Sequence, residues 1–433
     1  MESVDWILSS RISSSANIKR SVLISDAGDC RGDLPIVRSL GVRNVATTLL
    51  TQGVLVPSLF SRWHSDRICC PSPDANLEGF VAALLRIVRT RKYSTIFPIG
   101  DNSLRSISEH RDQLTPYLNL ALPSHESIVK ALDKSQTLNA AEEIGIPTPQ
   151  TFRARNTAEV MEISTRIQYP AVIKPRRSYV LDRNGKAHYA RPFYVNSASE
   201  LLSTYVRVNE NFPMPLIQEY VPGHNISVAL LFDRGEPKAA CFIRVYRAIP
   251  ITGGTSVLRE SIPPDSTLMR YASDLLRSMN WHGVAEVEFR VDSRDSIPKL
   301  MEINARFWGS MNVAIESGVD FPYLLYLLAM GKRIRPVFNY RFGVKYRWLD
   351  GDTQNLVSTL KGDSRLINGE FVDKLNAVLR FLKVYEKNMH YDGFAISDPL
   401  PFFLNEMFSA KEIAKYIIGK AKRRLVTQQH LSA

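Results

Sequence analysis

Two neighbouring stretches near residue 300 restrict the fold of this chain more than any other part of the sequence. In Gly283-Val-Ala-Glu-Val-Glu-Phe289 and in Lys299-Leu-Met-Glu-Ile-Asn304, apolar and polar side chains alternate. This alternation is the period of a half-buried β-strand. Residues 292–298, between the two stretches, are rich in turn formers such as Asp and Ser. The two strands are therefore predicted to form a hairpin.

The polar side chains of this hairpin favour a particular chemistry. Glu288, Glu302 and Asn304 supply carboxylate and amide oxygens on adjacent strands. Such hard oxygen ligands suit Mg²⁺ that is also held by phosphate groups. Arg306 follows where the second strand should end, and a cation there could face negative charge on a transferred phosphoryl group. The alternative is a solvated strand face on which Glu and Arg form cross-strand ion pairs.

The same residues resemble the metal-binding end of the ATP-grasp superfamily, as in biotin carboxylase and carbamoyl-phosphate synthase. In that family a Glu and a later Glu-x-Asn-x-Arg hold the metal ions and the γ-phosphate, and here Glu288 precedes Glu302-Ile-Asn-Ala-Arg306. The resemblance implies that ATP and Mg²⁺ (or Mn²⁺) are cofactors. It also implies that Glu288, Glu302 and Asn304 bind the metal and that Arg306 is catalytic.

The length of the chain, 433 residues, is too great for one hydrophobic core and predicts two or three domains. With the resemblance, the expected fold is α/β (α+β ATP-grasp) in three parts. Residues 1–120 are expected to form a Rossmann-like domain, residues 121–333 the two-lobed ATP-grasp domain, and residues 334–433 a helical C-terminal region.

Composition and net charge indicate which classes of partner to expect for this chain. The net charge of +12 would suit nucleic acid, yet the basic residues are spread along the chain, so we expect no nucleic-acid partner. No apolar run approaches the roughly 20 residues that span a bilayer. Cys30, Cys69, Cys70 and Cys241 lack metal-type spacing, which favours a reduced, cytoplasmic protein.

The first part of the chain alternates predicted strands with predicted helices, which indicates a parallel sheet covered on both faces. Gly28 follows the first strand without a G-x-G-x-x-G fingerprint, so a dinucleotide site is not expected there. The predicted strands cover residues 21–25, 44–50 and 94–100, and the predicted helices cover residues 34–40 and 77–88.

Two lysines are candidates for binding the nucleotide phosphates. Lys134 follows Asp133 between two predicted helices, and the ATP-grasp resemblance assigns such a lysine to the phosphates; taken alone it could be a surface lysine. Lys174 lies inside the apolar strand of residues 169–175. Burying a lone ammonium costs several kcal/mol, so Lys174 needs an anionic partner or a wet cleft.

A flexible loop over the phosphates is expected next, at residues 176–186. Loops of this kind in the family are commonly rich in Gly and Ser, because backbone amides must approach the phosphates. This loop offers Ser178 and Gly185 among several arginines. We therefore expect side chains to hold more of the phosphate charge than usual.

The stretch from Met214 to Gly223 resembles the hinge that holds adenine. An extended segment with free backbone edges is what adenine recognition requires, and the alternative is an edge strand that enters a turn. The resemblance assigns the base edge to backbone groups near Glu219 and Val221. The residues implied in nucleotide binding here are Gln218, Glu219, Tyr220, Val221 and Asn225, the last for the ribose.

A cation and a Gly-Gly loop follow in Arg247-Ala-Ile-Pro-Ile-Thr-Gly-Gly-Thr-Ser256. This stretch resembles uncharacterised ATP-grasp proteins related to the large subunit of carbamoyl-phosphate synthase. Arg247 with the amides of Gly253 and Gly254 could bind a substrate carboxylate, although a simple connecting turn fits the same residues.

The C-terminal region carries a basic amphipathic stretch at residues 411–425. Packing on the body of the protein is the preferred interpretation, and contact with an anionic membrane surface is the alternative. The sequence leaves the oligomeric state open, with a homodimer as one option.

The function expected from these features is ATP- and Mg²⁺-dependent ligation of a small carboxylate substrate to an amine through an acylphosphate. One alternative is a bicarbonate-activating enzyme similar to carboxylases or carbamoyl-phosphate synthase. Another is a nucleotide-binding regulatory protein without catalysis, which the glycine-poor loop supports. The identity of the carboxylate and the amine is not encoded in a transferable motif.

Overall fold

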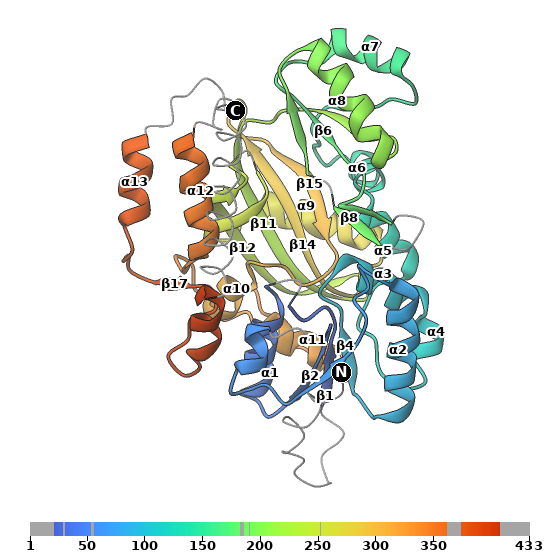
Figure 1. Ribbon diagram of the computed structural model, residues 1–433, viewed down its shortest axis with the longest axis vertical. Helices are drawn as coiled ribbons and strands as arrows, with labels where there is room; N and C mark the ends of the chain where they lie inside the picture. The colour runs from blue at the N-terminus through green and yellow to red at the C-terminus, as the bar shows by residue number, and fades with distance from the viewer. Residues whose placement is uncertain are drawn as a thin grey trace, which may run out of the picture.

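A seven-stranded sheet lies at the centre of the molecule, with a parallel sheet on one side and a smaller sheet on the other (Figure 1). This arrangement comes from a computed structural model. Its described residues are 21–28, 31–52, 56–181, 186–189, 191–251, 253–361 and 374–407. Among them no helix has the length and apolar character needed to cross a bilayer. The predicted α/β class is confirmed.

The N-terminal sheet is parallel throughout, with strand order β3-β2-β1-β4. Its strands are β1 (Ser21–Ile24), β2 (Ala46–Thr51), β3 (Asp66–Cys69) and β4 (Thr95–Phe97). Strand β3 was not predicted, because its sequence Asp-Arg-Ile-Cys has no apolar alternation. The accompanying helices are α1 (Asp33–Gly41), the short 3₁₀ helix η1 (Pro57–Phe60), α2 (Leu77–Thr90), α3 (Asp101–Glu109) and α4 (Arg111–Leu114).

Two capped helices lead from this sheet into the middle of the chain. Ser124 caps α5 (His125–Leu132) by accepting a hydrogen bond from the Ser127 amide, and Asp133 caps α6 (Lys134–Glu143) through the Ser135 amide. Such caps satisfy amides that the first turn of a helix leaves without partners. The caps fix where α6 starts, and they place Lys134 at its first residue.

The smaller sheet has strand order β5-β10-β6-β9 and forms one lobe with two helices. Apolar side chains from α7 (Thr157–Arg166) and α8 (Ala198–Asn211) bury its inner face. The strands are β5 (Thr151–Arg153), β6 (Ala171–Lys174), β9 (Phe193–Val195) and β10 (Leu216–Glu219). A separate antiparallel pair is formed by β7 (Tyr179–Leu181), which lies within the expected flexible loop, and β8 (Ala187–Tyr189), which directly follows that loop. Residues 182–185, which include Gly185, lie outside the described residues.

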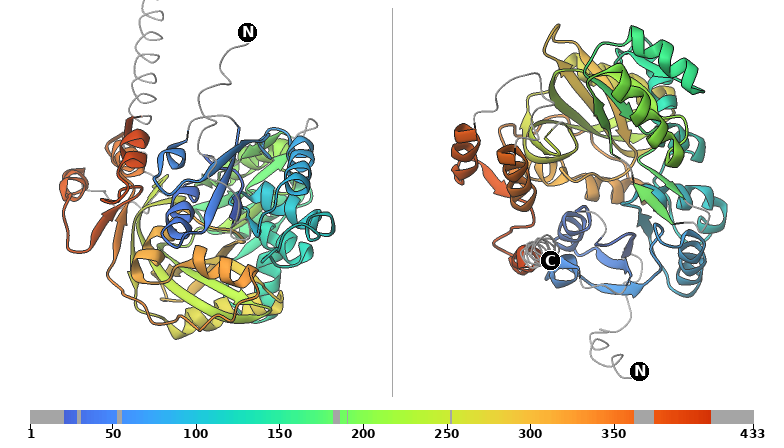
Figure 2. Two further views of the ribbon diagram at one scale, coloured as in Figure 1. Left: turned by 90° about the horizontal axis from the view of Figure 1, so that it is seen from below. Right: turned by 45° about the horizontal axis from the view of Figure 1, so that its top comes forward.

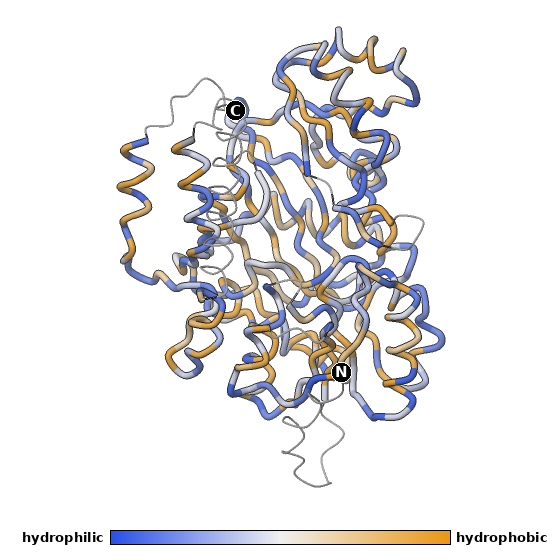
Figure 3. The backbone as a smooth tube through the Cα atoms, in the orientation of Figure 1, coloured by the Kyte–Doolittle hydropathy of each residue, from blue (hydrophilic) through white to orange (hydrophobic). Residues whose placement is uncertain are grey.

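The central sheet has strand order β15-β14-β11-β12-β13-β16-β17. Hydrophobic and hydrophilic residues alternate along its strands (Figure 3). The sequence predicts this alternation, because successive side chains of a strand point to opposite faces of the sheet and the two faces have different surroundings. The strands are β11 (Gly223–Asp233), β12 (Glu236–Ile249), β13 (Thr255–Ile262), β14 (Gly283–Asp292), β15 (Pro298–Asn304), β16 (Lys345–Arg347) and β17 (Met389–Tyr391). The helices packed with it include α9 (Ser266–Ser278), α10 (Met311–Ser317) and α11 (Phe321–Ala329).

The region after residue 334 contributes strands as well as helices. Strand β16 pairs with β13, and β17 pairs with β16, so this region extends the central sheet. Helix α12 (Leu349–Lys361) packs against β12 and against α13 (Lys374–Leu382). The right view of Figure 2 shows these two orange helices side by side at the edge of the molecule. An expectation of helices alone missed β16 and β17, because three-residue strands carry no readable period. The basic stretch 411–425 lies outside the described residues.

Candidate active site

The strand register brings the predicted acidic residues together. In the β14–β15 hairpin Glu288 is opposite Glu302, and Glu286 is opposite Asn304. The Nδ2 of Asn304 donates hydrogen bonds to Glu286 Oε2 (3.0 Å) and to Glu288 Oε1 (2.9 Å). Ser310 donates a further hydrogen bond to Glu286 Oε1 at 3.2 Å. Three carboxylates and one amide thus share one face of the hairpin.

Lys134 reaches the same face from the start of α6. Its Nζ lies 3.0 Å from Glu302 Oε2 and donates to Ser178 Oγ at 3.1 Å. Lys174 ends β6 and lines the same cleft. Burial lowers the pKa of Lys174, while the nearby Glu302 opposes that shift. The strand lysine therefore has the anionic surroundings that its sequence required.

The three carboxyl groups differ in protonation because their surroundings differ. Burial raises the pKa of Glu286 to about 7. Burial, followed by repulsion from Glu302 and Glu286, raises the pKa of Glu288 well above its usual value. Burial also acts to raise the pKa of Glu302, but the charges of Lys134 and Lys174 outweigh it and hold that pKa at about 2.

This donor set fits a divalent cation by its chemistry. Hard divalent cations bind carboxylate and amide oxygens. Two of the carboxylates, Glu286 and Glu288, are buried close together, which raises the pKa of both. In the present arrangement no three acidic, histidine or cysteine side chains of the described residues form a metal-ligand group. Instead the Lys134 ammonium pairs with Glu302, and the Asn304 amide bridges the other two carboxylates.

Arg306 lines the cleft immediately after β15. Its Nε donates to Asp101 Oδ1 at 2.6 Å, and its Nη1 donates to the Phe307 carbonyl at 3.0 Å. Asp101 begins α3, so this ion pair joins the N-terminal sheet region to the end of the hairpin. The predicted catalytic cation is therefore at the cleft, and its guanidinium contacts Asp101 and the Phe307 carbonyl.

A second arginine, Arg31, enters the cleft from the N-terminal part of the chain. Its Nη1 lies 3.2 Å from Asp392 Oδ2, and its guanidinium lies 3.9 Å from the centre of the Trp348 ring. Burial lowers its pKa to about 10. Sequence reasoning missed Arg31, because a loop arginine before α1 carries no periodic signal. It also missed Glu286, although Glu286 alternates in step with Glu288.

The loop at residues 176–186 contributes arginines to the site in two ways. The guanidinium of Arg176 binds the carboxylate of Asp133 with contacts of 3.2 and 2.8 Å, which holds the start of α6. Arg177 and Ser178 line the cleft. The hydroxyl of Tyr189 on β8 donates to Asp74 Oδ2 at 2.7 Å, so the β7–β8 pair is fastened to the N-terminal part of the chain.

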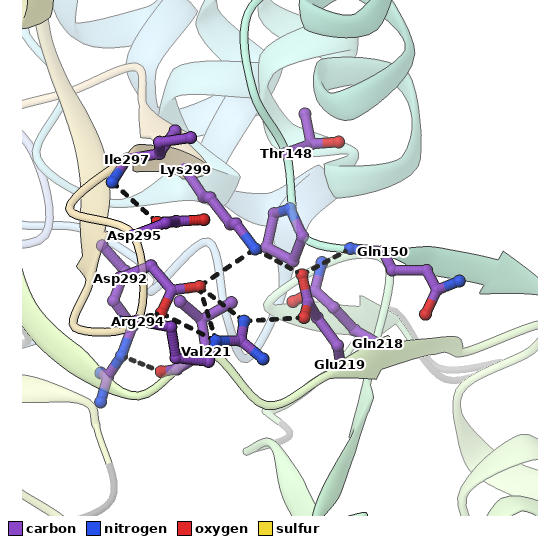
Figure 4. Close-up of polar contacts among 12 residues, drawn as sticks. Thr148, Gln150, Gln218, Glu219, Val221, Asp292, Arg294, Asp295, Ile297 and Lys299 are labelled. Atoms are coloured by element: carbon purple, nitrogen blue, oxygen red, sulfur yellow. Dashed lines mark hydrogen bonds and ion pairs between the residues drawn. The ribbon is translucent and has the colours of Figure 1, made fainter. Parts of the chain in front are cut away.

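The predicted adenine hinge lies at the end of β10 and in the residues that follow it (Figure 4). Gln218 is buried, and its Nε2 donates to Thr151 Oγ1 at 2.9 Å. The backbone amide of Glu219 donates to the Gln150 carbonyl at 2.9 Å, and the Val221 carbonyl accepts a 2.6 Å hydrogen bond from Arg290 Nε. These backbone groups are therefore used within the protein.

The Glu219 side chain is part of a cluster of charged side chains (Figure 4). Its carboxylate lies 2.8 Å from Lys299 Nζ and 2.9 Å from Arg294 Nη2. Both cations also contact Asp292, whose side chain is fully buried. None of the residues Gln218, Glu219, Tyr220 and Val221 lines the cleft that the described residues form, whereas Asn225 does.

The predicted substrate residues separate into two groups. Gly253 and Gly254 line the cleft. Gly254 has φ +154°, and a Cβ there would lie 2.7 Å from the Ile249 carbonyl oxygen, so the loop requires glycine at this position. Arg247 instead binds Asp352 with contacts of 2.6 and 2.7 Å and lines a neighbouring cavity.

The cleft that collects these residues has a volume of ≈410 Å³. It lies between the small lobe, the central sheet and the segment before α1, and its lining includes Lys134, Lys174, Glu286, Glu288 and Glu302. Such a volume is within the range of small-molecule sites. Cations and carboxylates that line one cleft suit a polyanion that binds together with a divalent cation.

Comparison with known proteins gives a family match and several relatives. The family described as "ATP-grasp in the biosynthetic pathway with Ter operon" matches residues 211–351. The carbamoyl phosphate synthase large chain of Pyrococcus furiosus is 23% identical over 203 residues, which are 45% of this chain and 18% of that protein. The D-aspartate ligase of Enterococcus faecium is 22% identical over 245 residues, 52% of this chain and 58% of that protein.

Among solved structures, a biotin carboxylase from Campylobacter jejuni, described as a β,γ-ATP complex, has a TM-score of 0.61. It is 15% identical, and the match covers 75% of this chain and 74% of that one. At this identity the likeness establishes a common fold. The chain spans less than two thirds of the length of the curated relatives it matches.

Proposed function

From the ATP-grasp fold of this chain, we propose that the protein is an ATP- and Mg²⁺-dependent ligase that joins a carboxylate to an amine. One observation carries the proposal: Lys134 Nζ lies 3.0 Å from Glu302 Oε2. A candidate phosphate-binding cation at the start of α6 therefore meets the candidate metal-binding carboxylates of the central sheet. The match to a D-aspartate ligase supports amide formation in particular.

Each wall of the cleft has a separate role in this proposal. Lys134 and Lys174 attract and orient the ATP phosphates, and Arg306 and Arg31 face the transferred phosphoryl group. The residues that would hold Mg²⁺ or Mn²⁺ are Glu286, Glu288, Glu302 and Asn304. When bound, the metal supplies positive charge to the terminal phosphates of ATP.

The reaction proceeds in two displacements. A carboxylate oxygen of the substrate attacks the γ-phosphorus, the bond between the γ-phosphorus and the β-phosphate oxygen breaks, and ADP leaves with an acylphosphate remaining. The amine then attacks the acyl carbon, the carbon–oxygen bond to phosphate breaks, and an amide, inorganic phosphate and one proton are released. The protein contributes position and preorganised charge to both steps.

The test measures ADP release from ATP by the purified chain with pooled amino acids, with and without bicarbonate. Neutral hydroxylamine in place of the amine should give a hydroxamate from the trapped acylphosphate. We expect ADP release that requires an acid, and Glu302→Gln should abolish it. ADP release that depends on bicarbonate alone would indicate a carboxylase-like enzyme. Nucleotide binding without turnover would indicate a regulatory protein.

A further inference from the structure

A second cavity of ≈290 Å³ adjoins the cleft. Its walls come from the end of β12, the loop that carries Gly253, and helices α12 and α13. These helices belong to the C-terminal region, which has no part in holding the nucleotide in the proposal above. Because this volume is near the small end of ligand sites, a compact molecule would fill it.

The charge of this cavity is positive. Asp352 is its only acidic lining residue among those the structure describes, and its side chain is 1% exposed. Two guanidinium groups already neutralise it: Arg247 with contacts of 2.6 and 2.7 Å, and Arg347 Nε with one of 2.6 Å. Arg290 and Arg380 line the same cavity. The lining cations therefore exceed the anions, which favours an anionic ligand.

Arg290 stands where the cavity and the cleft meet. Together with Asn225, Val245 and Gly253, it lines both spaces. Its guanidinium is held in place because Nε donates to the Val221 carbonyl at 2.6 Å and Nη1 donates to Asn225 Oδ1 at 3.0 Å. A ligand carboxylate near Arg290 would thus be next to the space assigned to the terminal phosphates.

The cavity also has apolar lining residues. Leu356 of α12, Phe381 of α13 and Ile251 of the loop line it. A positively charged end and an apolar wall together suit an acid with an aliphatic or aromatic body, because each part of such a molecule finds its matching surroundings.

We propose that this second cavity binds the acid substrate, with its carboxylate directed to Arg290 and its apolar body between α12 and α13. The proposal rests on the ligase function proposed above and adds the class of the acid and the place where it binds. Arg290 is a positioning residue in this account, since it orients the carboxylate that attacks ATP.

Binding measured without turnover tests this placement. The probes are 4-fluorophenylacetate and its neutral amide, 4-fluorophenylacetamide, followed by ¹⁹F NMR in the presence of ADP. Leu356→Trp and Ala377→Trp fill the cavity from α12 and α13. Val357→Trp is the matched control, because Val357 follows Leu356 on α12 but is 42% exposed. Thermal unfolding and ADP binding of each variant verify that it is folded.

The wild type and Val357→Trp should bind the acid at least about tenfold more tightly than they bind the amide. Leu356→Trp and Ala377→Trp should each lower the affinity for the acid by at least about tenfold. Equal binding of acid and amide, no binding of the acid to the wild type, or unchanged binding to a folded filling variant would each overturn the proposal. The ADP-release assay tests the ligase function separately from the cavity assignment. An acid that binds here without supporting ADP release contradicts the ligase, whereas acid-dependent ADP release unaffected by Leu356→Trp contradicts the cavity assignment.

Discussion

At the scale of single residues, three glutamates on one hairpin face differ in protonation because their immediate surroundings differ. Glu302 faces two lysines and stays charged, whereas burial favours the protonated forms of Glu286 and Glu288. A bound divalent cation would replace the protons on the latter two. Cation binding in the cleft would therefore release protons.

The raised pKa of Glu286 predicts a pH-dependent stability in the cation-free protein. The folded pKa is about 7, against an ordinary value of 4.5. Between these values the native state keeps a proton that the unfolded state has lost, so the unfolding free energy falls as pH rises. Glu286→Gln should make this fall smaller by on the order of 1–3 kcal/mol, while Glu288, whose pKa is also raised, still contributes to it. Urea unfolding in EDTA at about pH 5 and about pH 8 measures it, and an equally steep fall in the variant would contradict this assignment.

Arg306 provides a second test at this scale, because its ion pair can be broken from either end. Arg306→Gln should abolish ADP release and cost about 1–2 kcal/mol of stability, since Arg306 Nε lies 2.6 Å from Asp101. Asp101→Asn should cost a similar stability but retain activity, because Arg306 remains at the cleft. Activity assays and urea unfolding of both variants measure this. Equal loss of activity in the two variants would mean that Arg306 acts only through the ion pair.

At the scale of elements, the β14–β15 hairpin is fixed to the small lobe by the ion cluster of Figure 4. Asp292 accepts hydrogen bonds from Arg294, and its carboxylate lies 3.1 Å from Lys299 Nζ. Its side chain is completely buried. The cluster therefore holds the end of the hairpin against Glu219, which sets the distance between the carboxylates and the small lobe.

Breaking this cluster should destabilise the protein. Asp292→Asn removes a buried charge that serves two cations and is expected to cost about 2–4 kcal/mol. Asp295→Asn in the same turn is the matched control, because Asp295 is exposed and accepts only the Ile297 amide in the contacts that define the turn. Its effect should stay within about 0.5 kcal/mol. Similar unfolding free energies for the two variants would remove the structural role assigned to the cluster.

Elements with a clear period were predictable, and those held by distant contacts were not. The alternation in β14 and β15 predicted both the hairpin and the shared face of Glu288 and Glu302. The sequence also predicted the extended strand that leads into the hinge. The ion-pair partners of Glu219, Lys299 and Arg294, are about 80 residues away along the chain. Sequence alone does not show that such ion pairs occupy the Glu219 carboxylate.

At the scale of the whole molecule, the last described segment ties the first sheet to the central one. Asp398 accepts hydrogen bonds from Arg38 Nε at 2.9 Å, from Ser61 Oγ at 2.6 Å and from the Arg62 amide at 2.9 Å. Asp392 contacts Arg31 and the fully buried Arg259. These contacts span more than 100 residues, so no local pattern could predict them.

Removing one of these ties should lower the stability of the entire fold. Asp398→Ala leaves the partly buried Arg38 and two other donors without their acceptor, and should cost about 2–4 kcal/mol. Asp66→Ala removes an exposed ion pair with Arg91 and should stay within about 1 kcal/mol. Urea unfolding measures both variants. A cost for Asp398→Ala as small as that for Asp66→Ala would mean that the C-terminal segment does not stabilise the N-terminal sheet.

The central claim is that carboxylates of the large sheet hold a divalent cation against a nucleotide whose phosphates meet Lys134 and Lys174. Calorimetric titration of a non-hydrolysable ATP analogue, with and without Mg²⁺, tests it most directly. The account predicts that Mg²⁺ strengthens binding to the wild type at least about tenfold and has little effect on Glu288→Gln/Glu302→Gln. Equal strengthening of both proteins by Mg²⁺, or no effect of Mg²⁺ on the wild type, would contradict it.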